Sequence, residues 1–157
     1  MRQVISVILF SISMILSSTA FAQEFFCSVR HQIGLFPEHG NWKATSNIQI
    51  EEHLKGGFII RPPTQADVKQ LKIVHPDKGW EKHPFIVYSV SLEVVIDTCD
   101  AGFNQYGYLR CDTIGDMSFN FNSNRFRRTS RGSYLSGSKV MNQDWPDLYS
   151  YGECFRR

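Results

Sequence analysis

The sequence predicts a mainly β fold, an antiparallel sandwich or open barrel that is stapled by disulfides and carries one short helix. Three observations predict it. Apolar and polar residues alternate in short runs, Gly, Asn and Ser separate these runs, and all four cysteines lie beyond residue 24. A period of two is typical of half-buried strands, and many short strands separated by turn residues form sandwiches or barrels. We therefore expect one β-rich domain over residues 23–157.

Residues 1–22 have the pattern of a cleaved signal peptide. Arg2 supplies the positive start, an apolar run continues to Leu16, and Ala20 and Ala22 are the small residues that precede a cleavage site. The apolar run is shorter than the roughly 20 residues that a membrane-spanning helix needs. We expect a protein that is exported to the periplasm or secreted, with no transmembrane segment in the mature chain.

The strands are expected in a definite order along the chain. Residues 25–29 alternate first, and residues 48–50 then lead into residues 58–61 through a turn near Gly56, which predicts a hairpin. The strongest strand pattern covers residues 85–98, whose side chains on one face are Tyr88, Val90, Leu92, Val94 and Ile96. We place this strand at the centre of the sheet. Further strands are expected at residues 106–113, 116–121, 125–130 and 147–155.

One segment departs from the strand pattern. Thr64 follows two prolines and can cap a helix that has Asp67 in its first turn, and Val68 and Leu71 then share one face. We expect a single short helix over about residues 65–72, lying across an edge or an end of the sheet.

The four cysteines predict two disulfides. An even number of cysteines in an exported chain indicates disulfides rather than a metal site or a catalytic thiol. Cys99 and Cys111 bracket a polar, glycine-containing connection between two strand patterns, so we expect a Cys99–Cys111 bridge that closes a short hairpin. The remaining pair, Cys27–Cys154, would then tie the first strand to the last. The sequence alone leaves the two other pairings open.

The charge of the chain argues against a nucleic-acid partner. It carries 17 Lys and Arg against 15 Asp and Glu, a formal net charge of +2, whereas nucleic-acid-binding domains usually carry a strongly basic surface. Residues 81–116 are rich in acidic side chains and residues 117–157 in basic ones. These two stretches can pair across strands, where opposite charges are mildly favourable.

No catalytic or metal-binding motif stands out. The stretch GSYLSG at residues 132–137 lacks the glycine spacing of a nucleophile elbow. The histidines are too far apart for a local metal-binding pair, and they are His31, His39, His53, His75 and His83. The one group that merits inspection comprises His75, Asp77 and His83. We therefore expect neither a metal nor a cofactor, and we favour a non-enzymatic function.

The best candidate for a binding surface is the arginine-rich stretch FNFNSNRFRRTSRGSY, residues 119–134. It predicts a hairpin that turns at residues 123–124. Alternation would then send four side chains toward the core, with the last of them at its margin: Phe119, Phe121, Phe126 and Arg128.

Arg125 and Arg127 would face outward beside two asparagines. Guanidinium groups bind carboxylate, phosphate or sulfate through paired hydrogen bonds. Arg131 and Tyr134 extend this candidate patch. The alternative is structural: the arginines would blunt a sheet edge or meet the acidic residues of a neighbouring hairpin.

Aromatic side chains near the end of the sequence add to the candidates. Trp145 precedes a proline and is expected in a loop, and Tyr149 follows it closely. Aromatic rings with polar neighbours bring large contact area at low entropic cost and are used to contact proteins and sugars. The candidate binding residues are therefore Arg125, Arg127, Arg131, Tyr134, Trp145 and Tyr149.

These features together lead us to expect a small exported β domain that binds a protein or an envelope component. One alternative is a carbohydrate-binding module that uses loop aromatics. The other is a small hydrolase whose site carries no recognisable motif. No pattern in the sequence predicts an oligomeric state.

Overall fold

One antiparallel sheet contains all the described strands of the protein. The structure is a computed structural model that describes residues 23–38, 41–46, 48–74, 76, 79–113, 115–130 and 147–157. The strands in chain order are β1 (Phe25–Glu38), β2 (Asn41–Thr45), β3 (Phe58–Arg61), β4 (Phe85–Ser89), β5 (Val94–Cys99), β6 (Tyr108–Cys111), β7 (Asp116–Asn120), β8 (Arg125–Ser130) and β9 (Asp147–Arg156). The helices are α1 (Gln65–Val74) and two short 3₁₀ helices, η1 (Glu52–Leu54) and η2 (Trp80–Lys82). The predicted mainly β class is confirmed.

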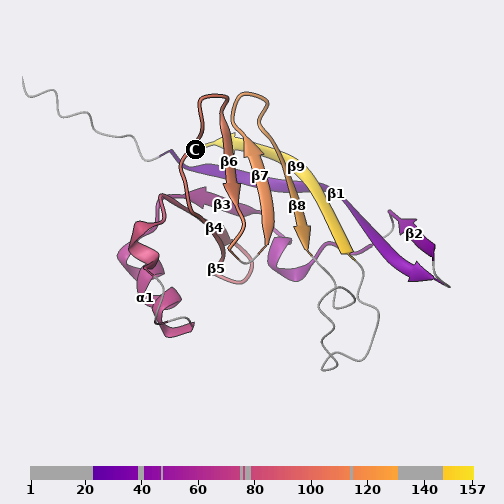
Figure 1. The fold of residues 1–157 in the computed structure, drawn as a ribbon, viewed down its shortest axis with the longest axis horizontal. Helices are drawn as coiled ribbons and strands as arrows, with labels where there is room; N and C mark the ends of the chain where they lie inside the picture. The colour runs from indigo at the N-terminus through magenta and orange to yellow at the C-terminus, as the bar shows by residue number, and fades with distance from the viewer. Residues whose placement is uncertain are drawn as a thin grey trace, which may run out of the picture.

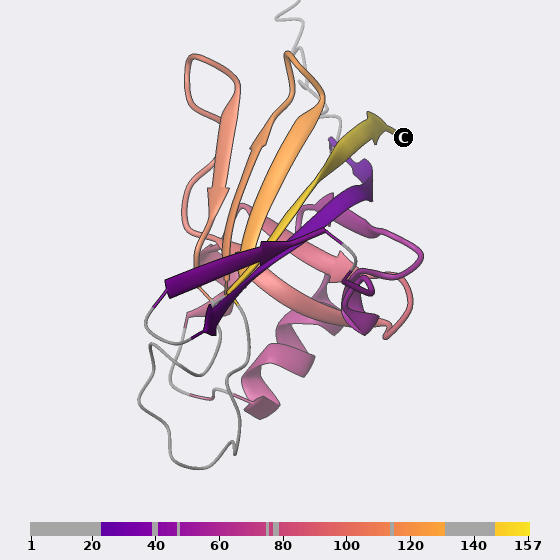
Figure 2. The same ribbon diagram turned by 90° about the vertical axis from the view of Figure 1, so that its right-hand side faces the viewer.

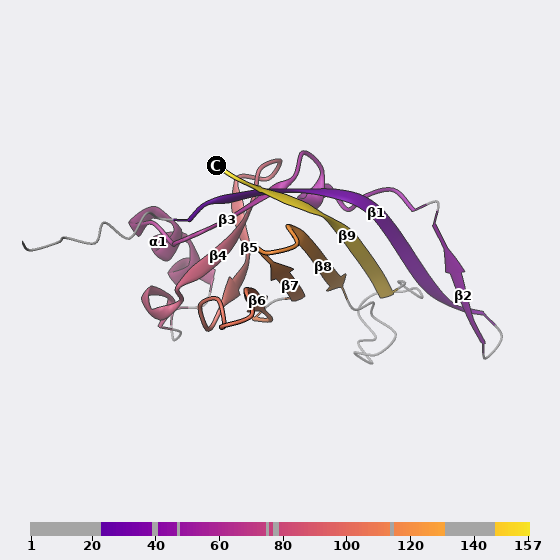
Figure 3. The ribbon, with the colours of Figure 1, turned by 90° about the horizontal axis from the view of Figure 1, so that it is seen from above.

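The sheet is nearly closed into a barrel. Its strand order is β5–β4–β3–β1–β9–β8–β7–β6, and β2 is added alongside β1. The two ends of this order, β5 and β6, lie near each other (Figure 1). The long strands β1 and β9 pair along most of their length, and β1 continues beyond the barrel to meet β2 (Figure 3). Of the two predicted architectures, the open barrel is therefore the one that forms.

Both predicted disulfides are present, and one of them joins the two ends of the sheet. Cys27 and Cys154 face each other on the neighbouring strands β1 and β9, and both are fully buried. Cys99 on β5 is bonded to Cys111 on β6. The pairing is as predicted, but the second bridge does not close a hairpin. It links the two strands between which the barrel would otherwise open.

The predicted central strand at residues 85–98 is instead a hairpin at one end of the sheet. β4 and β5 pair with each other, and residues 90–93 form the turn between them. The Ser89 hydroxyl accepts a hydrogen bond from the Leu92 amide, and Glu93 has a left-handed backbone with φ of 54°. A side-chain hydroxyl that binds a nearby amide competes with the continuation of a strand. The apolar alternation therefore concealed a turn, and the central strands are β1 and β9.

The predicted hairpin between residues 48–50 and 58–61 is also wrong. Residues 48–50 form no strand, and β3 pairs with β1 and β4 instead. Gly57 permits the close approach to β1, because a Cβ at this position would lie 2.5 Å from the Cys27 carbonyl oxygen. Its φ of 87° is also a conformation that glycine adopts without strain.

The predicted helix is present as α1 and begins at the predicted cap. The Asp67 amide donates a hydrogen bond to Thr64 Oγ1 at 3.3 Å, and Asp67 Oδ2 accepts one from the Thr64 amide at 2.6 Å. Arg61 donates two hydrogen bonds to the same carboxylate. Burial raises the pKa of Asp67, but the hydrogen bonds from Arg61 and Thr64 lower it by more, so this pKa lies below its ordinary value. Leu71 is buried, and α1 packs beside β5 (Figure 2).

The barrel interior has an apolar end and a polar end. Residues that face each other in the register point to the same side of the sheet, so the interior is filled row by row. One inward row is apolar and crosses β6, β7 and β8 at Leu109, Phe119 and Phe126. The next inward row crosses five strands and consists of buried Gln32, Ser150, Arg128, Met117 and Cys111. Polar side chains therefore enter the interior two residues further along these strands, in the row next to the apolar one.

The predicted signal peptide, residues 1–22, lies outside the described residues. Within the part of the chain that the structure describes, no helix is long and apolar enough to cross a membrane. Two buried disulfides are typical of proteins in oxidising compartments. Export itself stays a prediction.

Candidate functional site

Arg125 and Arg127 lie on the outer face of the barrel, within a patch that four neighbouring strands build. One row of the register runs from β6 to β9 through Tyr108, Asn120, Arg125 and Glu153, and its first three residues belong to the patch. The next row crosses β7, β8 and β9 and comprises Ser118, Arg127 and Tyr151. We call these six residues the outer patch. The four strands stand side by side in Figure 1.

The outer patch is hollow along β7. Ser118 and Asn120 carry short side chains, whereas Tyr108 on one side and the two arginines of β8 on the other are long. The resulting furrow has a volume of about 330 Å³ and extends to Tyr151 on β9. This volume lies at the small end of the range for sites that hold small ligands.

The hairpin that carries the arginines has a longer turn than predicted. The turn comprises residues 121–124, and Asn120 pairs with Arg125, so the register differs by two residues from the predicted one. The Asn120 side-chain oxygen accepts hydrogen bonds from the amides of Asn122 and Ser123, which favours the longer turn. A shift of two residues keeps every side chain on the same face. The outward direction of the two arginines is therefore as predicted.

Phe121 does not belong to the core, contrary to the prediction. It lies in the turn with 42% of its surface exposed, whereas Phe119 and Phe126 are buried as predicted. Its ring packs edge-on against Phe103, with the ring centroids 5.3 Å apart. The turn begins two positions earlier than predicted, at residue 121, and this removes Phe121 from the alternation of β7.

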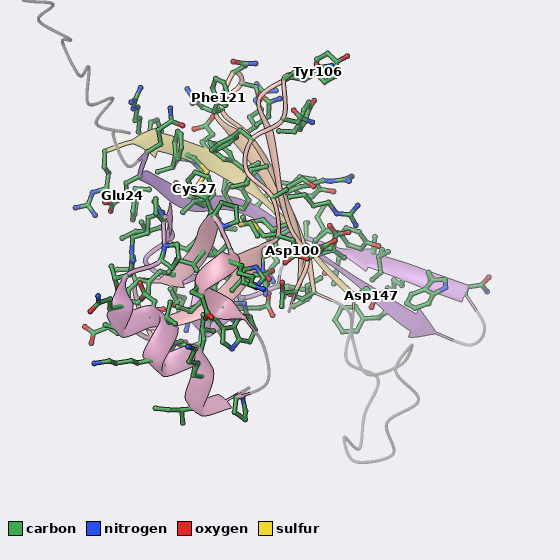
Figure 4. The ribbon with its side chains drawn as sticks, turned by 60° about the vertical axis from the view of Figure 1, so that its left-hand side comes forward. Glu24, Cys27, Asp100, Tyr106, Phe121 and Asp147 are labelled. Atoms are coloured by element: carbon green, nitrogen blue, oxygen red, sulfur yellow. A yellow bond between two sulfur atoms is a disulfide. The ribbon has the colours of Figure 1, made fainter. Side chains whose placement is uncertain are left out.

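Two loops beside the outer patch are tied together by hydrogen bonds. The Phe121 amide donates to the Gly107 carbonyl at 3.0 Å, and Asn122 Nδ2 donates to the Tyr106 carbonyl at 3.1 Å. Figure 4 shows Tyr106 and Phe121 at the tips of these neighbouring loops. The loops thus fix each other at the upper end of the furrow.

Neither Arg125 nor Arg127 has an ionic partner among the described residues. The acidic side chains of the same face bind other arginines. Arg110 lies 3.3 Å from Asp112 and 3.8 Å from Asp116, and Glu153 lies 3.5 Å from Arg30. β8 also pairs on both sides, so its arginines do not blunt a sheet edge. The carboxylates of the acidic hairpin therefore pair with Arg110 of β6 and not with Arg125 or Arg127 of β8.

Of the other predicted binding residues, Tyr149 is the one that the structure describes, and it does not line the furrow. Tyr149 lies on β9, is half-buried and pairs with Thr129, one row away from Tyr151. Three further candidates lie outside the described residues, namely Arg131, Tyr134 and Trp145. Sequence reasoning missed Tyr108 and Ser118. Both residues lie in predicted strands, but the sequence does not show that these strands are the neighbours of β8 in the sheet.

A second cluster of polar side chains lies inside the polar end of the barrel. Arg128 is only 6% exposed, so its predicted position at the core margin is wrong. Its Nη1 lies 3.3 Å from Glu51 Oε2 and donates to Ser130 Oγ at 2.6 Å. Ser130 donates to the same Glu51 oxygen at 3.1 Å. Burial lowers the pKa of Arg128 below its ordinary value, and the charges of Glu51 and Asp97 partly offset this effect.

Asp97 holds the seam between β5 and β6 at this end of the barrel. Its carboxylate accepts hydrogen bonds from the amides of Thr98, Thr113 and Gly115 at 2.8, 3.2 and 3.1 Å. The hydroxyls of the two threonines lie 2.7 Å apart and are hydrogen-bonded. These bonds supplement the neighbouring Cys99–Cys111 bridge where the strands do not pair through their backbones.

His53 lies next to the buried ion pair and resists protonation. Its Nε2 is 3.8 Å from Glu51 Oε2. Burial lowers the pKa of His53 below its ordinary value of 6.5, and the charge of Arg128 lowers it further, whereas Glu51 raises it in part. The folded protein therefore keeps this imidazole neutral at a pH where a free histidine is charged.

We expect the stability of the protein to fall as the pH drops below about 6.5. Between that pH and the lower pKa of His53 in the folded state, the unfolded chain binds more protons, so the free energy of unfolding decreases. Thermal unfolding followed between about pH 8 and pH 5 measures this slope, and His53→Gln should reduce it. An equal slope in His53→Gln and the wild type would contradict the assignment.

The histidine and aspartate group singled out in the sequence is only partly described. His83 Nδ1 lies 3.0 Å from Asp100 Oδ1, and His75 and Asp77 lie outside the described residues. Among the residues that the structure describes, no three His, Cys, Asp or Glu side chains converge as a metal-binding group.

Comparison with known proteins assigns no family: no protein-family model, no curated protein and no solved structure matches the chain. Function is therefore inferred from the outer patch itself.

Proposed function

We propose that the protein is an exported, non-enzymatic binding protein that uses the outer patch to hold an anionic group of a protein or an envelope component. One observation carries the proposal. Arg125 and Arg127 point outward beside a furrow, and neither has an ionic partner among the described residues. A guanidinium group that is not engaged in an ion pair is available to an external carboxylate, phosphate or sulfate.

Both arginines can act on the same ligand. Residues two positions apart on a strand face the same side and lie about 7 Å apart. Each guanidinium presents several N–H donors in one plane, so it can bind two oxygens of one anion. Tyr108 and Tyr151 are 53% and 41% exposed at the two sides of the furrow, and their rings can cover the apolar part of a ligand.

The lining of the furrow supports binding rather than hydrolysis. Its described side chains are guanidinium, phenol, phenyl, hydroxyl and amide groups, with no His, Asp, Glu, Lys or Cys among them. A hydrolase needs a base or a pair of carboxylates that converge on the reacting atoms. The furrow residues do not provide one. The two disulfides support the exported location of this activity.

We expect sodium sulfate to perturb the side-chain Nε–Hε signals of Arg125 and Arg127 before those of Arg30 and Arg110. The reason is that the other arginines on this face, Arg30 and Arg110, already have carboxylate partners. A nuclear magnetic resonance titration of the purified protein measures the effect. The double variant Arg125→Gln and Arg127→Gln should lose the saturable response and keep its melting temperature, because exposed substitutions rarely change stability by more than about 0.5 kcal/mol.

A charge-matched control separates site binding from general attraction. Arg156→Gln with Arg157→Gln makes the same change of net charge at exposed positions at the end of β9. This variant should retain the response of the β8 arginines. A response that disappears equally in both double variants, or that never involves the β8 arginines, would refute the proposal.

A further inference from the structure

Building on the proposed function, we infer that the ligand of the outer patch is an acidic carbohydrate, an oligosaccharide whose sugars carry carboxylate or sulfate groups. The furrow over β7 combines two features that such a ligand uses together. Exposed tyrosine rings stand at both sides, and two guanidinium groups without partners among the described residues stand between them. An acidic sugar presents an apolar ring face and an anionic group on one rigid unit.

The spacing of the tyrosines suits more than one sugar ring. Tyr108 lies on β6 and Tyr151 on β9, with β7 and β8 between them. Neighbouring strands are about 4.8 Å apart, so the backbones of Tyr108 and Tyr151 are separated by about 14 Å across the strands. A short oligosaccharide laid across the furrow can contact both rings. Its acidic groups then pass over Arg125 and Arg127.

The remaining hydrogen-bonding groups of the furrow match a ligand that is rich in hydroxyls. The side-chain hydroxyls of Ser118, Tyr108 and Tyr151 have no hydrogen-bond partner among the described residues. A hydroxyl both donates and accepts, as a sugar hydroxyl does. Asn120 plays a different part, because its amide holds the turn and the neighbouring loop in place. The furrow therefore offers free hydroxyls on a fixed frame.

The backbone around the furrow is held in place by hydrogen bonds, which favours the binding of a small ligand that makes few contacts. β7 and β8 are paired on both sides, and the loop that contains Tyr106 is bonded to the turn after β7. A site that is ordered before binding loses little conformational entropy when it closes on a ligand. Tyr108 emerges from this fixed loop as the first residue of β6.

An acidic peptide fits the furrow less well. Extended peptides gain much of their affinity by adding a strand to a free sheet edge, and β7 and β8 have no free edge. A stable protein partner covers about 800 Å² on each side around buried aromatic anchors. The furrow holds about 330 Å³, and its two tyrosines are half-exposed rather than set into a pocket. These observations favour the carbohydrate over the peptide.

Calorimetric titration of the purified protein with four defined probes tests the inference. The probes are a hexamer of a uronic acid, a sulfated hexasaccharide, a neutral hexasaccharide and hexaglutamate. We expect at least one acidic oligosaccharide to bind, with hexaglutamate and the neutral oligosaccharide much weaker. Arg125→Gln with Arg127→Gln should weaken binding about tenfold or more. Tyr108→Leu and Tyr151→Leu should each weaken it about fivefold, the scale of one aromatic ring contact.

Control variants distinguish a loss of binding from a loss of folding. Leucine retains apolar bulk but removes the ring face, and the melting temperature of each variant shows that it is folded. Phe155→Leu changes an exposed aromatic residue of β9 outside the furrow and should leave affinity unchanged. Hexaglutamate that binds as tightly as the acidic sugars, with no effect of the tyrosine variants, would overturn the carbohydrate inference and leave anion binding intact. Failure of every anionic probe, sulfate included, would overturn the inference and the proposed function together.

Discussion

Replacement of both Cys27 and Cys154 by alanine is expected to lower the free energy of unfolding by about 5 kcal/mol. The two cysteines are 127 residues apart in sequence. Their bridge therefore closes a large loop in the unfolded chain, and the entropy that it removes grows with the length of that loop. A loss of this size is comparable to the whole stability of a small domain. Chemical denaturation of the wild type and the variant at one pH measures the difference.

The Cys99–Cys111 bridge provides the internal comparison. It spans 12 residues, so the same reasoning gives a loss of about 3 kcal/mol when both cysteines are replaced by alanine. Because this bridge joins β5 to β6, its removal should also increase amide hydrogen exchange in those strands while β1 and β9 stay protected. A larger loss from the short bridge than from the long one would contradict the explanation by chain entropy.

Replacement of Glu51 by Gln is expected to lower the free energy of unfolding by about 3 kcal/mol. The change removes the carboxylate that binds buried Arg128 and Ser130. A buried guanidinium that loses its partner retains the cost of its desolvation without the compensating attraction. Denaturant unfolding of the wild type and the variant near neutral pH measures the loss.

A double-mutant cycle isolates the ion pair. In a chain that already carries Arg128→Met, Glu51→Gln should lower the free energy of unfolding by about 2 kcal/mol less than in the wild type. The reason is that this chain has no buried guanidinium that could lose its partner. The neighbouring exposed pair of Glu52 and Lys55 is the surface control, and Glu52→Gln should cost less than about 1 kcal/mol. Additive losses from Glu51→Gln and Arg128→Met would show that the two side chains do not stabilise each other.

The inner and outer faces of β8 can be tested separately. Phe126 and Arg128 point into the barrel, whereas Arg125 and Arg127 point outward from the same strand. Substitutions on the inner face are therefore expected to change stability, and those on the outer face to change binding. The interior contacts of Arg128 also hold β8 in place beneath the outer patch.

Local features of the fold were readable from the sequence because they depend on short stretches of chain. β8 occupies the predicted residues 125–130, and α1 starts after the predicted cap at Thr64. The errors arose where a side chain changed the backbone path. Ser89 helped to turn a continuous apolar alternation into a hairpin, and Asn120 lengthened a turn by two residues. Both are hydrogen bonds to nearby amides, which composition and period do not reveal.

The sequence by itself determined the mainly β class and the outward direction of Arg125 and Arg127, because alternation with a period of two is preserved by any even shift of register. It favoured the disulfide pairing that the structure shows but left the two other pairings open. Only the tertiary structure decided which strands are neighbours. It placed Tyr108 and Tyr151 at the sides of the arginine furrow, and it brought Glu51 to Arg128 from 77 residues away. Strand order and long-range pairing depend on the free energy of the whole packed barrel, so no single segment encodes the site that they create.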